Sequence, residues 1–237
     1  MSTGVIGILG GMGPDATAWF FSRLVKLDHA PTDQEHLHVI VESDPSIPDR
    51  TAWLLGKGTD PLPAMLASAR RLMAAGADIA GIPCMTAHAF LPALRQHTRL
   101  RFLSAFEELA RTLETQYSNI RTIGILGTMG TRHTALFEQH LPAFEVLWPD
   151  WHLHESLVME AIYGKEGIKA GNTGEGPREA LRTAARHLVA QGAQCIIAGC
   201  TEVPLVLTQS DVEVPFIDPM EGLALGLIRE ARRGARP

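Results

Sequence analysis

The hydrophobic residues of the chain fall into short continuous runs and longer stretches with helical spacing. Residues 5–9 form the first short run, and residues 16–27 follow with apolar positions spaced for one face of a helix. The turn between them, Gly-Gly-Met-Gly-Pro-Asp at residues 10–15, places a proline where a helix would begin. This pattern predicts a buried strand, a glycine turn and a helix, with backbone N–H groups at the turn that suit a carboxylate or a phosphate.

The same pattern occurs twice along the chain. Residues 6–13 (IGILGGMG) are echoed by residues 123–130 (IGILGTMG). Two further apolar runs, residues 79–82 and 195–198, each follow a Gly-Ala pair and each lead to a cysteine. Matching segments at near-equal spacing predict two duplicated βα halves.

Each half is expected to form a domain. We expect a first domain of residues 1–117 plus 215–237 and a second domain of residues 118–214. Within these ranges, residues 214–218 indicate a short strand and residues 222–232 a final helix, and we expect both elements to return to the first half. The predicted fold class is α/β, with a short, mostly parallel sheet flanked by helices in each domain and the active site in the interdomain cleft.

Isolated basic residues lie in two of the predicted loops. Residues 42–50 contain too many prolines, aspartates and serines for regular structure and end in Arg50. The glycine-rich loop 164–176 carries Lys165 and Lys169. The remaining helical patterns cover residues 61–75, 106–115, 155–163 and 177–190.

Composition narrows the classes of protein and partner. Of the 237 residues, 46% are hydrophobic and 20% are charged, which is ample for a folded α/β protein. The formal net charge of −5 and the scattered Lys and Arg residues argue against nucleic acid or a membrane as a partner. No apolar run approaches the roughly 20 residues that span a bilayer, and the N-terminus does not resemble a signal peptide. We therefore expect a cytoplasmic protein, whose three cysteines are reduced thiols.

Cys84 and Cys200 each follow a predicted buried strand and precede a predicted helix, which places both thiols at the carboxyl edge of a parallel sheet. Because a helix N-terminus lowers a thiol pKa from about 8.5 toward neutral, both thiols are expected to be available as thiolate bases. Two such thiols on opposite sides of a substrate carbon would remove a proton from one face and deliver one to the other. This inverts a stereocentre without a cofactor. Cys195 lies inside its strand and is expected to be a core residue.

The carbanion formed between the two proton transfers needs hydrogen-bond donors. The expected donors are the two glycine turns and two hydroxyl groups, namely Met12, Gly13, Thr128, Met129, Gly130, Thr86 and Thr201. If the substrate has a second carboxylate, Arg50 would serve as a bidentate clamp and Lys169 as a point charge.

Three other kinds of site fit parts of the sequence less well. Cys84, His88 and Cys200 could bind zinc with Glu202 nearby, but the chain has no close Cys-x-x-Cys pair. Papain-like catalysis by Cys84 and a distant histidine leaves the second cysteine unexplained. Residues 11–16 formally match the dinucleotide-binding pattern G-x-G-x-x-A, but the proline removes a donor and the repeat copy abandons the pattern.

Several motifs, taken in order, resemble the aspartate/glutamate racemase family and, within it, the aspartate racemase branch. They are GGMGP (10–14), DQEH (33–36), IPDRT (47–51), PCMTAH (83–88), GTMGT (127–131), IKAG (168–171) and GCTEVP (199–204). Together they cover nearly the whole chain. Glu202 resembles the aspartate branch, because glutamate racemases of cell-wall synthesis usually carry histidine there.

The resemblance implies a racemase that does not depend on pyridoxal phosphate (PLP), with two pseudo-symmetric Rossmann-like domains and usually a homodimer. It implies no cofactor, no metal and a small-molecule amino-acid substrate. Cys84 and Cys200 would be the paired acid and base, and Arg50 and Lys169 would recognise the side-chain carboxylate of aspartate or glutamate. The expected substrate-binding residues are Met12, Gly13, Arg50, Met85, Thr86, Thr128, Gly130, Thr131, Lys169, Thr201 and Glu202.

Met85 departs from the family, which commonly has asparagine after the first cysteine. A thioether in place of the amide removes a polar contact to the substrate and adds apolar bulk. We expect aspartate as the first substrate and glutamate as the second, with a broad-specificity amino-acid racemase as the nearest alternative. A related decarboxylase or isomerase and a non-catalytic amino-acid-binding protein are further alternatives.

Overall fold

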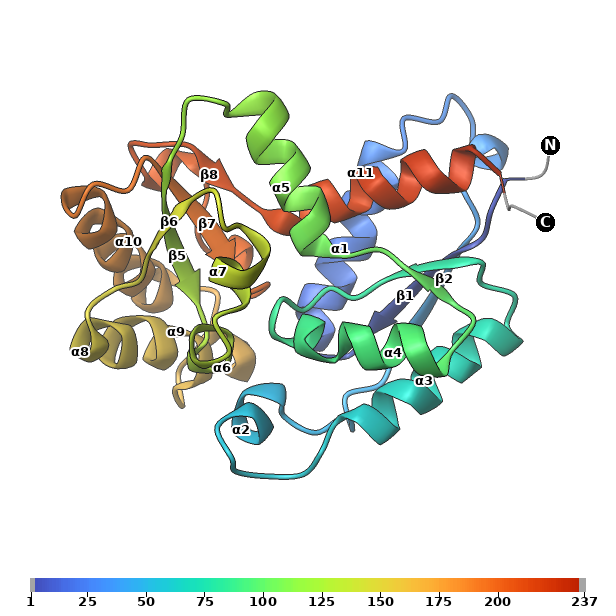
Figure 1. The fold of residues 1–237 in the computed structure, drawn as a ribbon, viewed down its shortest axis with the longest axis horizontal. Coiled ribbons are helices and arrows are strands. Elements are labelled where there is room, and N and C mark those ends of the chain that lie inside the picture. Colours follow the sequence, from blue (N-terminus) through green and yellow to red (C-terminus); the bar gives the residue numbers. More distant parts are fainter. Residues whose placement is uncertain (1–2, 235–237) are drawn as a thin grey trace. The chain divides into compact units, whose positions relative to one another are not determined.

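The computed structural model describes residues 3–234 and shows two compact units (Figure 1). The first unit contains the described residues up to Leu109 together with those from Met220 onward, and the second unit is Ala110–Pro219. The chain passes from one unit to the other twice, after Leu109 inside helix α5 (Ala105–Gln116) and after Pro219. In this part of the chain, no helix has the length and apolar character needed to cross a bilayer.

The first unit is built on a parallel sheet with the strand order β2-β1-β3-β4. The strands are β1 (Ile6–Gly10), β2 (Val39–Ser43), β3 (Ile79–Gly81) and β4 (Arg101–Phe102). Besides the start of α5, its helices are α1 (Pro14–Leu27), α2 (Arg50–Leu54), α3 (Leu62–Ala74), α4 (Leu91–His97) and α11 (Pro219–Arg232), with the short 3₁₀ helices η1 (Asp33–Glu35) and η2 (Thr86–Phe90). All residues of β1 are buried, as expected for an apolar run in the middle of a parallel sheet.

The second unit has a parallel sheet with the strand order β6-β5-β7-β8. The strands are β5 (Thr122–Gly127), β6 (Glu145–Leu147), β7 (Cys195–Gly199) and β8 (Phe216–Ile217). The helices are α6 (Met129–His133), α7 (Leu136–His140), α8 (Trp151–Leu153), α9 (Glu160–Tyr163) and α10 (Glu175–Ala190), with a π-helical segment η3 (His154–Met159) and the 3₁₀ helices η4 (Ile168–Ala170), η5 (Val203–Leu205) and η6 (Gln209–Asp211). The two sheets share one topology, so the duplicated α/β fold predicted from the sequence is confirmed.

The Gly-Ala pair that the sequence repeats has the same packing role in both units. Its first residue, Gly76 or Gly192, follows a helix and has a positive φ angle, 96° and 104° respectively, which favours glycine. Its second residue, Ala77 or Ala193, packs against the glycine that follows the first isoleucine of the central strand. A Cβ atom added to that glycine would lie 3.0 Å from the alanine Cβ in each unit. The repeated Gly-Ala pair therefore lets the end of a helix pack closely against the central strand of the sheet in each unit.

Each unit has its own apolar core, formed where a helix covers the sheet. Helix α3 buries Met65, Ala69 and Leu72 in the first unit, and helix α10 buries Leu181 and Leu188 in the second. These positions follow the spacing of one helix face. Full burial of a leucine side chain contributes roughly 1.5–3 kcal/mol to the free energy of folding. Such contacts therefore stabilise the packing of each helix on its sheet.

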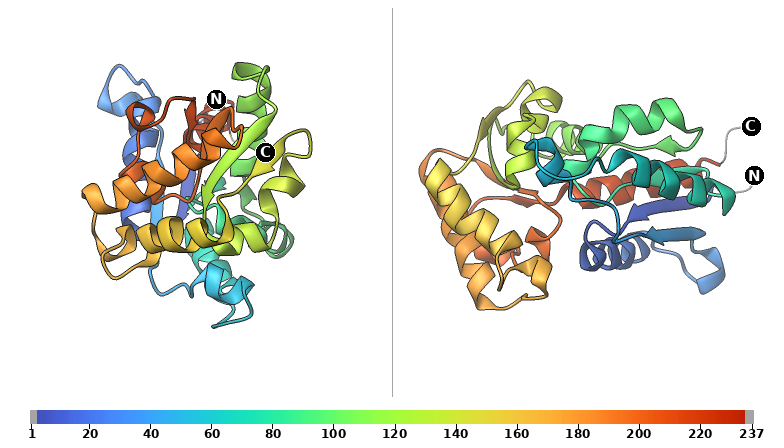
Figure 2. Two further views of the ribbon diagram at one scale, coloured as in Figure 1. Left: turned by 90° about the vertical axis from the view of Figure 1, so that its left-hand side faces the viewer. Right: turned by 90° about the horizontal axis from the view of Figure 1, so that it is seen from below.

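Helix α11 brings the end of the chain back to the first unit. Arg229 donates hydrogen bonds to Glu108 at 2.7 and 3.2 Å, and Arg232 donates to Asp28, next to the end of α1, at 2.6 Å. Figures 1 and 2 show α11, in red, beside the blue α1. These charged pairs fix a helix that also covers Gly81 of β3 with leucine side chains.

Strand β8 corrects one expectation from the sequence. We expected it to return to the first half with the final helix, but Phe216 and Ile217 pair with Ile196 and Ile197 of β7 in the second sheet. Pairing satisfies backbone groups along the outer edge of β7, which would otherwise be an open edge. The side chain of Gln209 also accepts a hydrogen bond from the Phe216 N–H at 2.8 Å, which holds the short strand in place.

The glycine turn after β1 depends on a close backbone approach. Gly11 has a φ angle of 91°, and a Cβ atom there would lie 2.4 Å from the backbone carbonyl carbon of Asp44. The Gly11 N–H donates to the Thr17 hydroxyl at 2.9 Å, and that hydroxyl donates to the Gly13 carbonyl at 2.8 Å. The turn is therefore tied to the first turn of α1 and leaves no space for a side chain at Gly11.

We expect Gly11→Ala to lower the free energy of unfolding by at least about 2 kcal/mol more than Gly76→Ala. Gly76 has a similar φ angle of 96° but no atom within 4 Å of an added Cβ, so its substitution introduces only backbone strain of about 1–2 kcal/mol. Urea denaturation of the two variants checks this difference. Equal losses would show that the overlap with Asp44 is relieved at little cost.

Candidate active site

Cys84 lies just beyond the carboxyl end of β3, in the segment that leads into η2. Its backbone N–H donates to the Ile82 carbonyl at 2.8 Å, which closes a tight turn after the strand. The residue is only 6% exposed. This position, at the carboxyl edge of a parallel sheet, is where α/β proteins place their ligands.

His88 fixes the backbone beside Cys84. Its Nδ1 atom lies 2.9 Å from the Cys84 carbonyl oxygen, and its Nε2 atom accepts a hydrogen bond from the backbone N–H of Ala105 at 3.0 Å. Because Nε2 is the acceptor, Nδ1 carries the proton and donates to Cys84. Both ring nitrogens are thus bound to the backbone. Among the residues that the structure describes, no group of three or more His, Cys, Asp and Glu side chains is arranged to hold a metal ion.

Cys200 directly follows β7 and contacts a buried carboxylate. Its thiol donates a hydrogen bond to Oε2 of Glu202 at 2.8 Å, and the Thr201 hydroxyl donates to the same oxygen at 3.3 Å. Glu202 is only 3% exposed, so these donors replace water around its carboxylate. One carboxylate oxygen of Glu202 therefore accepts hydrogen bonds from both the Cys200 thiol and the Thr201 hydroxyl.

Lys169 balances the charge of Glu202. Its Nζ atom lies 2.5 Å from Oε1 of Glu202, and the lysine side chain is 22% exposed whereas that of the glutamate is 4% exposed. The ring of Tyr163 lies 5.5 Å from the same Nζ, within the range of a cation–π contact. The structure thus brings three predicted site residues, Cys200, Glu202 and Lys169, into one hydrogen-bonded chain.

The Cys200 thiol has a pKa well above its ordinary value, contrary to the expectation from the sequence. Burial is the main cause and the Glu202 carboxylate is the second, while the Lys169 ammonium opposes them. The predicted lowering by a helix N-terminus is absent because only the short 3₁₀ helix η5 follows, and its dipole is small. Cys200 therefore keeps its proton near neutral pH. Burial alone raises the pKa of the Cys195 thiol to about 12, which agrees with its role in the core.

Arg50 is buried at the start of α2 and binds the glycine turn of the first unit. Its guanidinium donates to the carbonyl oxygens of Met12 at 3.1 Å, Pro48 at 3.0 Å and Ile47 at 3.3 Å. Asp49 caps the start of this helix, because its side chain accepts the Ala52 N–H at 2.6 Å. Arg50 thus links the loop that carries it to the Met12–Gly13 turn, and both belong to the predicted site.

The matching turn of the second unit is also held from within the protein. The Thr128 hydroxyl caps α6 by accepting the Thr131 N–H at 3.3 Å, and the two threonine hydroxyls lie 3.1 Å apart. The Met129 N–H, expected to be a donor to substrate, instead donates to the sulfur of Met159 at 3.3 Å. Gly130, at the centre of the turn, is buried.

Met85 and Thr86 follow Cys84 and begin η2. Both are buried, and Met85 is only 1% exposed. The residue that departs from the family pattern is therefore packed inside the protein beside the first cysteine. This burial is consistent with the apolar character of a thioether and would leave an amide in need of partners.

His154 is a buried residue in the second unit that the sequence did not identify as part of the site. Its ring nitrogens contact the Gly127 carbonyl at 2.8 Å and Nη1 of Arg132 at 2.9 Å. Burial lowers its pKa to about 4, and the nearby Arg132 charge acts in the same direction. In the sequence, His154 lies just before a predicted helix. Nothing in that position indicates that its ring contacts Gly127 and Arg132, which are far away along the chain.

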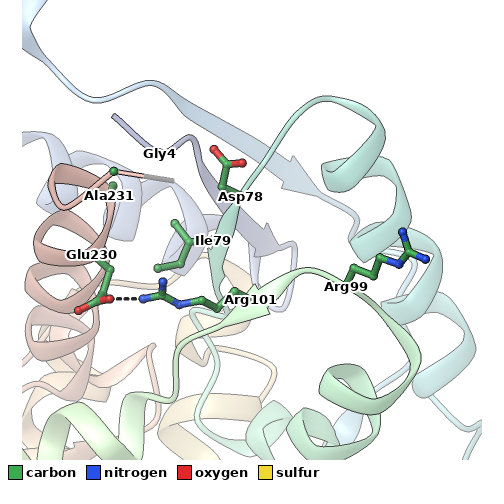
Figure 3. Close-up of a pocket in the computed structure, with 8 residues that line it drawn as sticks. Gly4, Asp78, Ile79, Arg99, Arg101, Glu230 and Ala231 are labelled. Atoms are coloured by element: carbon green, nitrogen blue, oxygen red, sulfur yellow. Dashed lines mark hydrogen bonds and ion pairs between the residues drawn. The ribbon is translucent and has the colours of Figure 1, made fainter. Parts of the chain in front are cut away.

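A pocket of about 360 Å³ lies at the opposite edge of the first sheet from Cys84 (Figure 3). It is lined by Ile79 and Arg101, the first residues of β3 and β4, whereas Cys84 follows the last residue of β3. Arg101 forms an ion pair with Glu230 of α11 across this pocket. The residues that line the pocket include none of the predicted site residues.

Comparisons with known proteins agree on one family. Residues 9–225 match the family described as Asp/Glu/Hydantoin racemase. A broad-specificity amino-acid racemase of Bacillus subtilis, RacX, is 28% identical over 230 residues, which cover 93% of this chain and 95% of the relative.

Solved structures of racemases have the same fold. The aspartate racemase of Picrophilus torridus matches with a TM-score of 0.83 and 25% identity, over 97% of this chain and 94% of that one. A glutamate racemase of Bacillus anthracis, isoform RacE1, matches with a TM-score of 0.67 and 16% identity, over 98% of this chain and 82% of that one. The second likeness is one of fold alone.

We expect Glu202→Gln to lower the pKa of the Cys200 thiol, because the substitution removes an adjacent negative charge and keeps the nearby Lys169. The rate of Cys200 alkylation at pH 8, followed by mass spectrometry, should rise about three- to tenfold, the gain in thiolate being partly offset by its lower nucleophilicity. Cys195, on the same strand, reports any opening of the sheet and should not change. An unchanged rate at Cys200 would contradict the assigned effect of Glu202.

Proposed function

We propose that the chain, which belongs to the Asp/Glu/hydantoin racemase family, interconverts the enantiomers of an acidic amino acid, aspartate first and glutamate second. One observation carries this proposal. The two units share one sheet topology, and Cys84 and Cys200 follow the corresponding strands β3 and β7. A pair of buried thiols at equivalent positions of a repeated fold suits a reaction in which two equivalent proton transfers occur.

In the proposed reaction one thiolate takes the proton from the α carbon, and the other thiol gives its proton to the opposite face. The C–H electron pair passes into the adjoining carboxylate and returns to form the new C–H bond. The two cysteines exchange protonation states, so no cofactor is consumed and none is needed. Because Cys200 holds its proton beside Glu202, we assign it the role of acid in the resting enzyme and Cys84 that of base.

Lys169 and Arg50 are the proposed binders of the substrate's side-chain carboxylate. The ion pair between Lys169 and Glu202 supports this role for Lys169, since its ammonium group already binds a carboxylate in the free protein. A substrate carboxylate of the same chemistry would compete for it. For Arg50 the support is positional, because its guanidinium contacts the turn that is proposed to hold the substrate.

The same link favours a second candidate function, broad-specificity amino-acid racemisation. If the Lys169–Glu202 ion pair persists when substrate binds, the protein offers less positive charge to an acidic side chain. Neutral amino acids would then compete better for the binding site. The similarity to a racemase named for broad specificity supports this reading. We further propose that the protein is a cytoplasmic homodimer that is independent of PLP, as the family resemblance implies.

Solvent exchange tests the reaction itself. In deuterated water without PLP or metal, L-aspartate should gain deuterium at the α carbon and lose optical activity. Cys84→Ser and Cys200→Ser should each reduce racemisation by at least about a hundredfold, the range of general acid–base catalysis. Cys195→Ala, a core substitution, should retain activity. If no member of a panel of amino acids exchanged its α proton, the proposed function would be wrong.

Lys169→Met separates the two candidate functions. An acidic-substrate racemase should lose about ten- to a hundredfold in kcat/KM for aspartate and much less for alanine, because a charge-assisted contact is removed only from the former. A broad-specificity enzyme should lose activity on both to a similar degree. Lys165→Met, in the same glycine-rich loop, is the matched control and should leave both values near those of the wild type.

A further inference from the structure

Segment η3 is a π-helical stretch, between α8 and α9 in the second unit (Figure 1). In an α-helix, residues five positions apart lie about 140° apart around the axis, so their side chains point in different directions. The i→i+5 hydrogen bonding of a π-helix brings such residues close to the same side. The first and last residues of η3, His154 and Met159, are five apart. His154 contacts Gly127, the last residue of β5, and Met159 contacts Met129 in the turn that follows.

His154 holds the carbonyl at the start of this turn. Its Nδ1 atom lies 2.9 Å from Nη1 of Arg132, which can only donate, so Nδ1 is the acceptor and Nε2 carries the proton. Nε2 then donates to the Gly127 carbonyl at 2.8 Å. The residue is fully buried, and the ring of Trp148 stacks on it at 5.6 Å between centroids. Its position and its tautomer are therefore both fixed.

Arg132 anchors the arrangement from the other side of His154. It also donates to the Pro149 carbonyl at 2.9 Å, and its guanidinium lies 3.9 Å from the centroid of the Trp151 ring. The arginine lies in α6, so His154 contacts the backbone of Gly127 on one side of the turn and the side chain of Arg132 on the other. His154 thus connects the end of β5 with α6, the two elements on either side of the turn.

Gly127 is closely packed where His154 holds it. A Cβ atom there would lie 3.2 Å from the Gly199 carbonyl oxygen and 3.2 Å from the Trp148 ring. Gly127 is paired in register with Gly199, the residue immediately before Cys200. The direction of the chain at Gly127 consequently sets where residues 128–131 lie relative to the second cysteine.

Met159 completes the contact at the other end of η3. Its sulfur accepts the Met129 N–H at 3.3 Å, a weak hydrogen bond at the second residue after Gly127. With the Gly127 carbonyl bound by His154 and the Met129 N–H bound by Met159, consecutive peptide groups of the turn are fixed by one helical segment.

We propose that η3 is a positioning element for the active site, in which His154 and Met159 set the orientation of the turn Thr128–Thr131 beside Cys200. This inference rests on the proposed function, because it assigns the turn to the substrate. It gives the π-helical geometry a purpose, since an α-helical segment would direct only one of the two side chains at the turn. His154 and Met159 are positioning residues and need not touch the substrate.

Amide hydrogen exchange tests the positioning without any turnover. In Met159→Leu, which keeps the side-chain size but removes the sulfur acceptor, the Met129 amide should exchange about five- to tenfold faster than in the wild type. Ser156→Ala, an exposed position in the same segment, and Met73→Leu, in the first unit, should leave this rate unchanged. If the Met129 rate did not change in Met159→Leu, the proposed role of the segment would be overturned.

Kinetics then test the consequence for catalysis. His154→Phe keeps a stacked ring but loses both hydrogen bonds, and kcat/KM for aspartate should fall about tenfold. His154→Gln retains a donor for the Gly127 carbonyl and an acceptor for Arg132, and should recover most of this loss. Equal losses in the two variants would mean that His154 only fills space. If the wild type racemised nothing while Met159→Leu still released the Met129 amide, the proposed function would fail and the structural positioning would stand.

Discussion

The hydrogen bond from the Cys200 thiol to Glu202 is the interaction on which the account of the second unit depends. It places a proton donor and a buried carboxylate 2.8 Å apart, and Lys169 makes the arrangement tolerable by neutralising the carboxylate from its other side. A buried charge without such a partner would be strongly destabilising. The three residues therefore form one hydrogen-bonded chain in which Cys200 keeps its proton and Lys169 pairs with Glu202.

Each unit places a cysteine just beyond the carboxyl end of one strand, β3 or β7, beside the glycine-containing segment that follows the neighbouring strand, β1 or β5. A side chain binds the backbone of each segment or of the strand end before it: Arg50 donates to the Met12 carbonyl, and His154 donates to the Gly127 carbonyl. The two units reach this arrangement with different residues. Duplication thus accounts for the shared backbone, while the side chains that surround it differ between the two units.

Much of the fold could be predicted from the sequence, because apolar runs and the repeated Gly-Ala pairs directly reflect buried strands and close helix packing. Strand β6 escaped prediction because its three residues, one exposed and two partly buried, are too few to show a strand pattern. The cysteines could be found from their repeated position. The raised pKa of Cys200 could not, since it depends on burial and on a carboxylate orientation that no spacing reveals. The hydrogen-bond partners of His154 lie 22 and 27 residues away along the chain, and they could not be predicted because they too depend on how the side chains are oriented.

The proposed reaction requires both cysteines to act on one carbon atom, and a crystal structure with bound aspartate tests this requirement. We predict that the sulfurs of Cys84 and Cys200 each lie within about 4 Å of the α carbon, on opposite faces, with the side-chain carboxylate near Lys169. Aspartate bound with only one sulfur near its α carbon, or with both sulfurs on the same face, would contradict it.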